Sequence, residues 1–160
     1  MTEAVQLAVG ERIPAFSTLD QDGNPFSSEA LMGRKTILYF FPAALTLGCA
    51  REAADFMEAQ PIFEAAGYQV IGVSPDSVEK LKRFQERDAL TFPLLSDEDI
   101  SIHKAFGAFG EKALYGRLYK GVLRSTVVVD EDGTVEYAFF RVKATGHVDD
   151  LLEAMGLAAR

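Results

Sequence analysis

Long apolar runs alternate with amphipathic segments in the first half of the chain. Residues 35–41 and 68–74 are nearly continuous apolar runs with β-branched and aromatic side chains, as is typical of strands buried on both faces. Between them, residues 49–66 place apolar side chains at helical spacing, and Gly67 follows as a helix-terminating residue. A second helix is predicted to begin at Ser77, a capping residue that precedes another apolar stripe. The pattern predicts a strand–helix–strand–helix unit.

The N-terminal part of the chain carries a weaker, alternating pattern. Residues 15–19 alternate between apolar and polar side chains and lead through a polar turn at residues 20–24 to Pro25. This combination predicts an edge hairpin. Residues 28–32 are expected to form a helical turn.

The second half of the chain predicts a short helix, a hairpin and a terminal helix. The short helix is expected over residues 96–106. Residues 125–130 and 134–139 are predicted strands joined across the turn at 131–133, which contains Asp-Gly. Residues 147–157 are amphipathic and predict a closing helix. The whole order predicts an α/β protein of thioredoxin-like fold, with a mixed central sheet flanked by helices and an N-terminal β-hairpin extension.

Length and charge narrow the class of protein. The 160 residues predict one domain over residues 1–160, and 16 lysines and arginines against 24 acidic residues give a formal net charge of −8. We therefore expect no nucleic-acid partner. Residues 1–10 lack the pattern of a signal peptide, and no apolar run reaches the roughly 18 residues that span a bilayer. We expect a cytoplasmic protein with no membrane partner.

The chemistry-bearing residues are few. The chain has a single cysteine, which excludes an intramolecular disulfide and the disulfide-stapled secreted class. His103 and His147 lie far apart in the sequence and outside any metal-ligand spacing, so we expect neither a metal nor another cofactor. Both histidines are predicted to have structural roles on their helices.

The position of Cys49 favours chemistry over packing. A lone cysteine is more often a small buried apolar residue than a nucleophile. Here, however, residues 42–49 run from the end of a buried strand into the start of a helix. Unpaired backbone N–H groups and the helix dipole favour an anion at that place, so a Cys49 thiolate would be stabilised.

The residues around Cys49 resemble the active-site motif of the peroxiredoxins, Pro-x-x-x-Thr-x-x-Cys. Pro42, Thr46 and Cys49 match it. Similarity to the bacterioferritin-comigratory, or Q-type, subgroup extends over nearly the whole chain. It includes residues 20–23, Glu52, 55–56, 72–77, 92–97, 124–126 and 130–133.

The resemblance implies a role for each matching residue. Cys49 would be the peroxidatic nucleophile, Thr46 would hydrogen-bond to the peroxide, and Pro42 would shield the sulfur. Arg124 would stabilise the thiolate and the substrate, and Glu52 would position that arginine. From the residues alone, Pro42 is equally a strand terminator and Thr46 equally a helix cap.

Three neighbouring positions bear on the reaction cycle. Ala54 stands where many members of the subgroup carry a second, resolving cysteine, and the sequence leaves open whether Ala54 is natural or engineered. Leu47 occupies a position where the family usually has proline. Gly48, beside Cys49, is expected to support the site by lending backbone freedom.

The resemblance implies a thioredoxin-dependent peroxidase that serves antioxidant defence. It would reduce hydrogen peroxide and organic hydroperoxides to water and alcohols through a Cys49 sulfenic acid. With no second cysteine, an external thiol must complete the cycle, and thioredoxin, glutaredoxin and low-molecular-weight thiols are the candidates. We expect a monomer, with a weak dimer as the alternative.

Two other classes of function compete with this one. A thioredoxin-like sensor that only forms mixed disulfides would not need Thr46 and Arg124. A holdase or structural role, acquired through oligomers, is the second alternative. Catalytic peroxide consumption with dithiothreitol would separate an enzyme from both.

Overall fold

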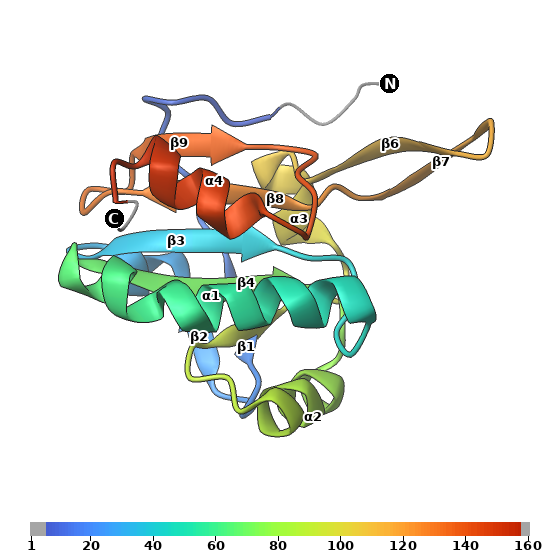
Figure 1. Cartoon of the computed structure of the whole chain (residues 1–160), viewed down its shortest axis with the longest axis horizontal. Helices are drawn as coiled ribbons and strands as arrows, with labels where there is room; N and C mark the ends of the chain where they lie inside the picture. Colours follow the sequence, from blue (N-terminus) through green and yellow to red (C-terminus); the bar gives the residue numbers. More distant parts are fainter. Residues whose placement is uncertain (1–5, 158–160) are drawn as a thin grey trace.

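A mixed sheet of seven strands forms the centre of the computed structural model, which describes residues 6–157 (Figure 1). The ends of the predicted domain, residues 1–5 and 158–160, lie outside the described residues. Across the sheet the strand order is β2-β1-β5-β4-β3-β8-β9. The predicted thioredoxin-like arrangement, a mixed sheet with helices on both faces, is confirmed.

The middle of the sheet is built from the two longest apolar runs. β3 (Lys35–Phe40) pairs in parallel with β4 (Tyr68–Ser74), and β4 pairs in parallel with β5 (Leu94–Ser96). On its other side β3 pairs antiparallel with β8 (Ser125–Val129), which in turn pairs antiparallel with β9 (Val135–Phe139). The four predicted strands are confirmed to within one residue at each end, whereas β5 is not among the predicted elements.

The predicted N-terminal hairpin is confirmed and extends the central sheet. β1 (Ser17–Asp20) pairs antiparallel with β2 (Pro25–Ser27) and, on its other edge, with β5. The predicted helical turn follows as a 3-10 helix, η1 (Ser28–Leu31).

Four α-helices cover the two faces of the sheet. α1 (Leu47–Ala65), α2 (Val78–Asp88) and α4 (His147–Ala154) pack on one face, and α3 (Ser101–Phe106) packs with η1 on the other. Alternate residues of β3 point to opposite faces because a strand has a side-chain period of two. The α1 face of β3 is formed by Ile37 and Tyr39, and the opposite face by Leu38 and Phe40.

The predicted helix over residues 96–106 is wrong in its first half. Residues 94–96 form β5, and the helix begins only at Ser101. Both carboxylate oxygens of Asp97 accept backbone N–H groups of the first turn of α3, from Ile102 and His103, at 3.1 and 2.8 Å. The chain therefore turns at Asp97 before the helix starts, and the Asp97 carboxylate accepts N–H groups that the first turn leaves without an intrahelical acceptor.

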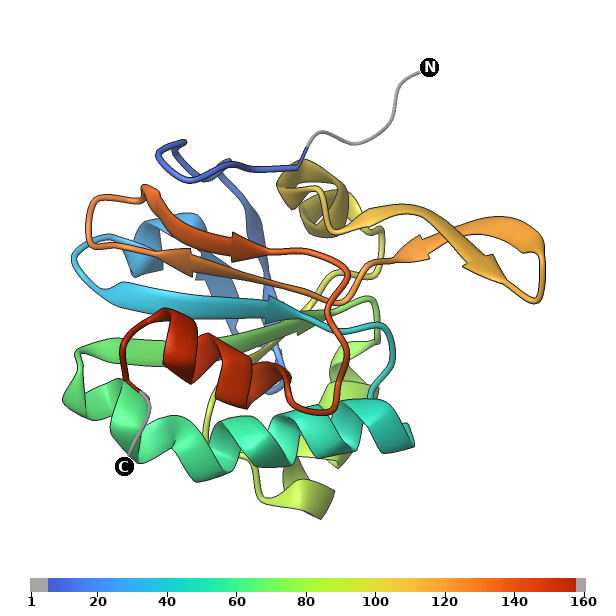
Figure 2. The ribbon, with the colours of Figure 1, turned by 45° about the horizontal axis from the view of Figure 1, so that its top comes forward.

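A second hairpin, which the sequence pattern does not predict, stands apart from the central sheet. It consists of β6 (Phe109–Leu114) and β7 (Arg117–Val122), which pair only with each other. Tyr115 and Gly116 form the turn, and their φ angles of 52° and 77° both lie in the left-handed region. A two-residue hairpin turn of type I′ requires positive φ at both positions. In Figures 1 and 2 the hairpin projects from the body at the end where α1 begins.

Within residues 6–157, no helix combines the length and the apolar character needed to cross a bilayer.

Candidate active site

Cys49 lies at the meeting point of β3, α1 and the start of β8. It is the third residue of α1, for which Thr46 is the N-cap, and its side chain is only 1% exposed. Because the helix supplies no acceptor for N–H groups in its first turn, the Cys49 N–H is available to a ligand. The predicted setting of the thiol, between a strand end and a helix start, is confirmed.

Arg124 bridges Cys49 and Glu52. One guanidinium nitrogen, Nη2, donates to the Cys49 Sγ at 3.4 Å, and the other, Nη1, donates to Oε1 of Glu52 at 2.6 Å. Glu52 follows Cys49 by one helical turn, so both side chains lie on the same face of α1. The structure thus brings together three of the predicted site residues, Cys49, Glu52 and Arg124. The first and the last of them are 75 positions apart in the sequence.

The charges in this group perturb one another. Burial raises the pKa of Glu52 to about 7, although the neighbouring Arg124 opposes the shift. Burial works against the charge on Arg124, but the Glu52 carboxylate and the Cys49 sulfur outweigh it and raise the pKa of the guanidinium. The pKa of the Tyr39 phenol is well above its ordinary value, mainly through burial and then through Glu52 and Cys49. The guanidinium is therefore the permanent cation of the site.

The hydroxyl proton of Thr46 is used in a hydrogen bond within its own loop. Its Oγ1–H donates to the carbonyl of Ala43 at 2.7 Å, and the side chain makes no capping hydrogen bond. The hydroxyl oxygen retains lone pairs that can accept a hydrogen bond from a peroxide O–H. In this geometry Thr46 is available to a ligand as a hydrogen-bond acceptor, and the N–H donors beside the sulfur are Arg124 and the Cys49 backbone.

Asp76 anchors the loop that carries the motif, a role that the sequence reasoning missed. Its Oδ2 accepts the backbone N–H of Ala44 at 2.6 Å and the hydroxyl of Ser74 at 2.8 Å. Lys80 places its Nζ 3.2 Å from the other carboxylate oxygen. The loop needs such support because Leu45 adopts a left-handed φ of 67°, which is unfavourable for a branched side chain. The only available signal was an aspartate directly after a buried strand.

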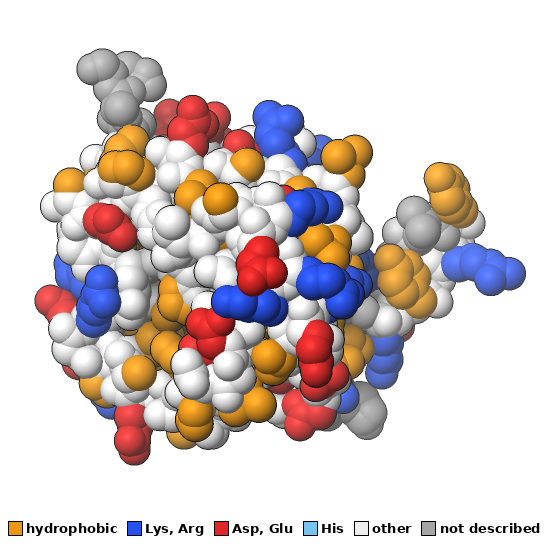
Figure 3. Space-filling view, turned by 90° about the horizontal axis from the view of Figure 1, so that it is seen from below, with side chains coloured by type: hydrophobic (Ala, Val, Ile, Leu, Met, Phe, Trp, Pro, Cys, Tyr) orange, Lys and Arg blue, Asp and Glu red, His pale blue; other side chains and the backbone are white. Residues whose placement is uncertain are grey.

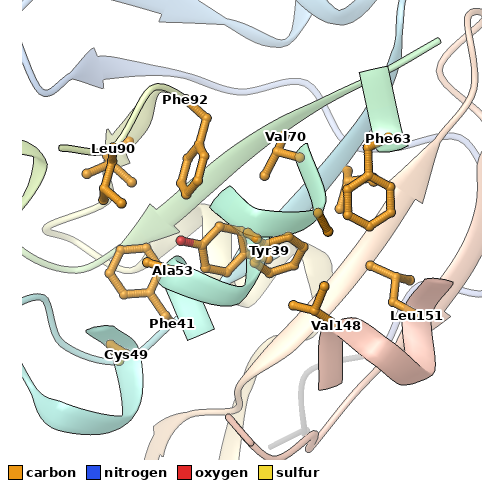
Figure 4. Packing of buried hydrophobic residues seen from close by; sticks show 14 of the residues in the cluster. Tyr39, Phe41, Cys49, Ala53, Phe63, Val70, Leu90, Phe92, Val148 and Leu151 are labelled. Atoms are coloured by element: carbon orange, nitrogen blue, oxygen red, sulfur yellow. The ribbon is translucent and has the colours of Figure 1, made fainter. Parts of the chain in front are cut away.

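Aromatic side chains on the α1 face of β3 form the wall behind the thiol. The Tyr39 ring stacks on those of Phe41 and Phe56, with centroids 5.4 and 4.3 Å apart. Figure 4 shows Phe41 close to Cys49 at the start of α1 and Tyr39 further along the helix. A Cβ at Gly72 would lie 3.0 Å from both Tyr39 and Phe41, so this close approach favours glycine.

The remaining motif positions differ in exposure. Pro42 is half-buried at the end of β3, and Leu47 is 89% exposed in the first turn of α1. A Cβ at Gly48 would lie 3.5 Å from Nη2 of Arg124, an ordinary contact distance. Ala54 is exposed while Cys49 is buried, so a cysteine at position 54 would face away from the thiol.

Both histidines are buried in structural contacts. His147 begins α4, and its Nε2 lies 2.7 Å from the hydroxyl of Thr126. Burial lowers the pKa of His147 to about 4, so the ring is neutral at physiological pH. His103 Nδ1 lies 2.6 Å from Asp97, next to the cap of α3. In the part of the chain that the structure describes, no three side chains of His, Cys, Asp or Glu gather as a metal site.

Comparison with known proteins identifies close relatives over most of the chain. Residues 9–138 match the family model described as the AhpC/TSA family. A putative peroxiredoxin of Mycobacterium tuberculosis is 50% identical over 151 residues, 94% of this chain and 96% of that protein. Peroxiredoxin Bcp of Escherichia coli is 38% identical over 146 residues, 91% of this chain and 94% of that protein.

A solved structure shows the same fold. The Xanthomonas campestris bacterioferritin comigratory protein is 34% identical, with a TM-score of 0.82 over 88% of this chain and 90% of that chain. Its structures were described in connection with its alkyl peroxide reduction activity.

The raised pKa of Glu52 predicts a pH dependence of stability. The folded chain keeps a proton on Glu52 up to about pH 7, whereas an unfolded chain releases it near the ordinary value of 4.5. The stability linked to this proton is therefore complete below pH 4.5 and is lost as the pH rises through about 7. Between pH 5.5 and 8 the free energy of unfolding of the wild-type protein should fall by on the order of 2 kcal/mol relative to that of Glu52→Gln.

Urea unfolding of both proteins at the two pH values measures this difference. Because all other titrating groups are shared, their contributions cancel in the comparison. Parallel losses of stability in the two proteins would contradict the prediction.

Proposed function

The chain belongs to the AhpC/TSA family and is a peroxiredoxin of the Bcp/PrxQ type, and from this premise we propose a one-cysteine peroxidase cycle centred on Cys49. The observation that carries the proposal is the contact of Arg124 Nη2 with the Cys49 sulfur at 3.4 Å, at the first turn of α1. A cation within hydrogen-bonding distance of the sulfur is placed to stabilise charge during nucleophilic attack by cysteine.

In the first half of the cycle the thiolate attacks the terminal oxygen of a hydroperoxide. An S–O bond forms and the O–O bond breaks, so that Cys49 becomes a sulfenic acid and the leaving alkoxide takes up a proton to give an alcohol. Arg124 and the Cys49 N–H are placed to stabilise the charge that moves onto the oxygens. Thr46 accepts a hydrogen bond from the peroxide O–H, and Pro42 limits the access of water.

In the second half of the cycle thiols from outside the chain return Cys49 to its reduced state. A first thiol attacks the sulfenic sulfur, an S–S bond forms, the S–O bond breaks, and the hydroxide leaves as water. A second thiol then releases the Cys49 thiolate and forms a disulfide with the first. One hydroperoxide and two thiols thus give one alcohol, one water and one disulfide. The external thiols follow from the single cysteine of the sequence.

The substrates we propose are alkyl hydroperoxides together with hydrogen peroxide. The support is the alkyl peroxide reduction activity named for the 34% identical Xanthomonas protein. We infer a cytoplasmic reaction with thioredoxin as reductant, since cytoplasmic thiols are kept reduced.

Replacement of the nucleophile tests the proposal directly. We expect Cys49→Ser to consume no peroxide in a metal-free assay with dithiothreitol, because no other side chain of the site can accept the peroxide oxygen. Its circular dichroism spectrum and unfolding curve should match those of the wild-type protein. Residual catalytic turnover by this variant would overturn the assignment of Cys49.

Removal of the guanidinium tests the role of Arg124. We expect Arg124→Met to slow the oxidation of Cys49 at least tenfold, since loss of one preorganised donor commonly costs about 2 to 4 kcal/mol of transition-state stabilisation. Stopped-flow measurement of the rate constant for peroxide, with Arg34→Met as the control at an exposed arginine, checks this. An unchanged rate constant would leave Arg124 with a structural role alone.

A second cysteine at position 54 is expected to change the oxidised product. Residues five apart on a helix are separated by about 7.5 Å along the axis, beyond the usual disulfide Cα range of roughly 4.4–6.8 Å, so α1 must unwind locally. Its first turn has few intrahelical hydrogen bonds to lose, which makes opening there far less costly than global unfolding.

Intact-mass measurement after one equivalent of peroxide should show Ala54→Cys lighter than its own reduced form by two hydrogen atoms, as expected for an internal disulfide. With excess peroxide the wild-type chain should gain oxygen atoms and reach the sulfinic acid, because no internal thiol intercepts the sulfenic acid. Equal overoxidation of the two proteins would mean that this end of α1 does not open.

A further inference from the structure

The β6–β7 hairpin is a two-stranded ribbon that, among the described residues, pairs with no third strand. Such ribbons have little stability by themselves, because both of their faces and edges meet solvent. Here cross-strand contacts hold it: Lys112 donates from Nζ to the carbonyl of Val122 at 2.8 Å and lies over the Tyr119 ring. Its outer part nevertheless presents large apolar side chains to solvent, with Tyr115 96% and Leu118 69% exposed.

Exposed apolar side chains concentrate at this end of the molecule. Seven large hydrophobic residues are exposed among the described residues, and four of them lie on the hairpin or at the start of α1. These four are Leu47, Tyr115, Leu118 and Tyr119. In Figure 3 hydrophobic and basic side chains are visible on the projecting hairpin. Three of the four share the hairpin, and exposed apolar groups that cluster, rather than scatter singly, indicate a contact surface.

The hairpin and the segment that follows β9 are basic, although the protein as a whole is acidic. Residues 109–124 and 140–146 together carry six lysines and arginines but one acidic residue, Glu111. The rest of the chain carries ten basic and 23 acidic residues. We call these two segments the basic rim.

The basic rim is one continuous surface that ends at the active site. Arg141 donates from Nη1 to the carbonyl of Glu111 at 3.0 Å, and Val142 donates its N–H to the carbonyl of Arg124 at 2.9 Å. β7 leads directly into Arg124, the residue that contacts the Cys49 sulfur. The end of the rim at Arg124 therefore lies next to the thiol.

We propose that the basic rim, the exposed side chains of the hairpin and Leu47 form the docking surface for a protein reductant with an acidic surface around its reactive thiol. The inference rests on the proposed one-cysteine cycle, which needs an external thiol at Cys49. A surface that is basic against an acidic body selects a partner of opposite charge and raises the rate of encounter.

Docking serves the thiol-exchange half of the cycle. The thiolate of the partner attacks the sulfur of the Cys49 sulfenic acid, an S–S bond forms, the S–O bond breaks, and the hydroxide takes a proton and leaves as water. A second thiol of the partner then attacks the partner's own sulfur, forms the partner's disulfide and releases the Cys49 thiolate. Because Cys49 is only 1% exposed, the first turn of α1, which carries Leu47, must open for this attack.

A second copy of the chain fits the surface less well. Two copies that met through this surface about a twofold axis would bring basic rim against basic rim. The repulsion of like charges opposes that contact, whereas an acidic partner is attracted.

The test uses a bacterial thioredoxin, with its reductase and NADPH, as the protein reductant and dithiothreitol as the small one. Arg117→Glu and Leu118→Ser alter the rim and hairpin, and Arg34→Glu and Val9→Ser are matched exposed controls elsewhere. Each hairpin variant should raise the KM for thioredoxin about fivefold or more, as for contact residues that matter in interfaces. The controls, and turnover with dithiothreitol in every variant, should remain at the wild-type level.

A trapped complex supplies a second measurement. A thioredoxin that retains only its attacking cysteine should form a mixed disulfide with Cys49, and hydrogen exchange should then slow in residues 109–122. Added salt should raise the KM of the wild-type protein for thioredoxin more steeply than that of Arg117→Glu.

Each contrary outcome identifies what fails. Wild-type KM values in the hairpin variants, or turnover with dithiothreitol but none with thioredoxin, would overturn the docking surface and leave the peroxidase intact. A dimer that dissociates in Arg117→Glu would overturn it in favour of a second copy. Loss of turnover with both reductants in the unaltered protein would remove the proposed function, and the docking surface with it.

Discussion

The hydrogen bond from Arg124 to Glu52 is the constraint on which the site depends. A guanidinium that is mostly out of water needs acceptors for its N–H groups, and the fully buried Glu52 supplies one at 2.6 Å. With one nitrogen held in this way, the other is directed at the Cys49 sulfur. Since Glu52 and Cys49 lie one turn apart on α1, the same helix presents both the anchor and the nucleophile.

The strand β3 and the loop after it fix the position of the thiol. β3 delivers the chain to one end of the sheet, and its period of two directs Tyr39 under α1, where the aromatic wall forms. The loop after β3 needs contacts from other segments to be stable, because Leu45 has an unfavourable φ angle. Asp76, from the loop after β4, holds it by accepting the N–H of Ala44. A strained loop fixed from a neighbouring strand gives the site a defined shape before substrate arrives.

The two substrates of the proposed cycle make different demands on the outer surface. A small neutral peroxide needs only a narrow opening, which agrees with a thiol that is 1% exposed. The docking surface that we propose for the reductant lies on the projecting hairpin and its basic rim. The hairpin ends at Val122, two residues before Arg124, so the proposed recognition surface and the contact with the Cys49 sulfur belong to one stretch of backbone.

The sequence alone determined the features that depend on local periodicity and on adjacent residues. The apolar runs of β3 and β4, the start of a helix near Cys49, and the spacing of Pro42, Thr46 and Cys49 are all visible along the chain, because strands and helices impose their periods on neighbouring side chains. The resemblance that this motif supports also pointed to Arg124 and Glu52.

Only the tertiary structure decided the features that arise between distant segments. The bond from Ala44 to Asp76 joins residues 32 positions apart, and it involves a backbone N–H that no sequence pattern marks. The direction of the Thr46 hydroxyl and the raised pKa of Glu52 depend on what surrounds them after folding. The β6–β7 hairpin escaped prediction because it lies outside the central sheet, and its strand β7 is exposed over four successive residues without the alternation that marks a half-buried strand. The contact of Arg124, two residues after this hairpin, with Cys49 follows from the path of the chain through the sheet, which local periodicity does not specify.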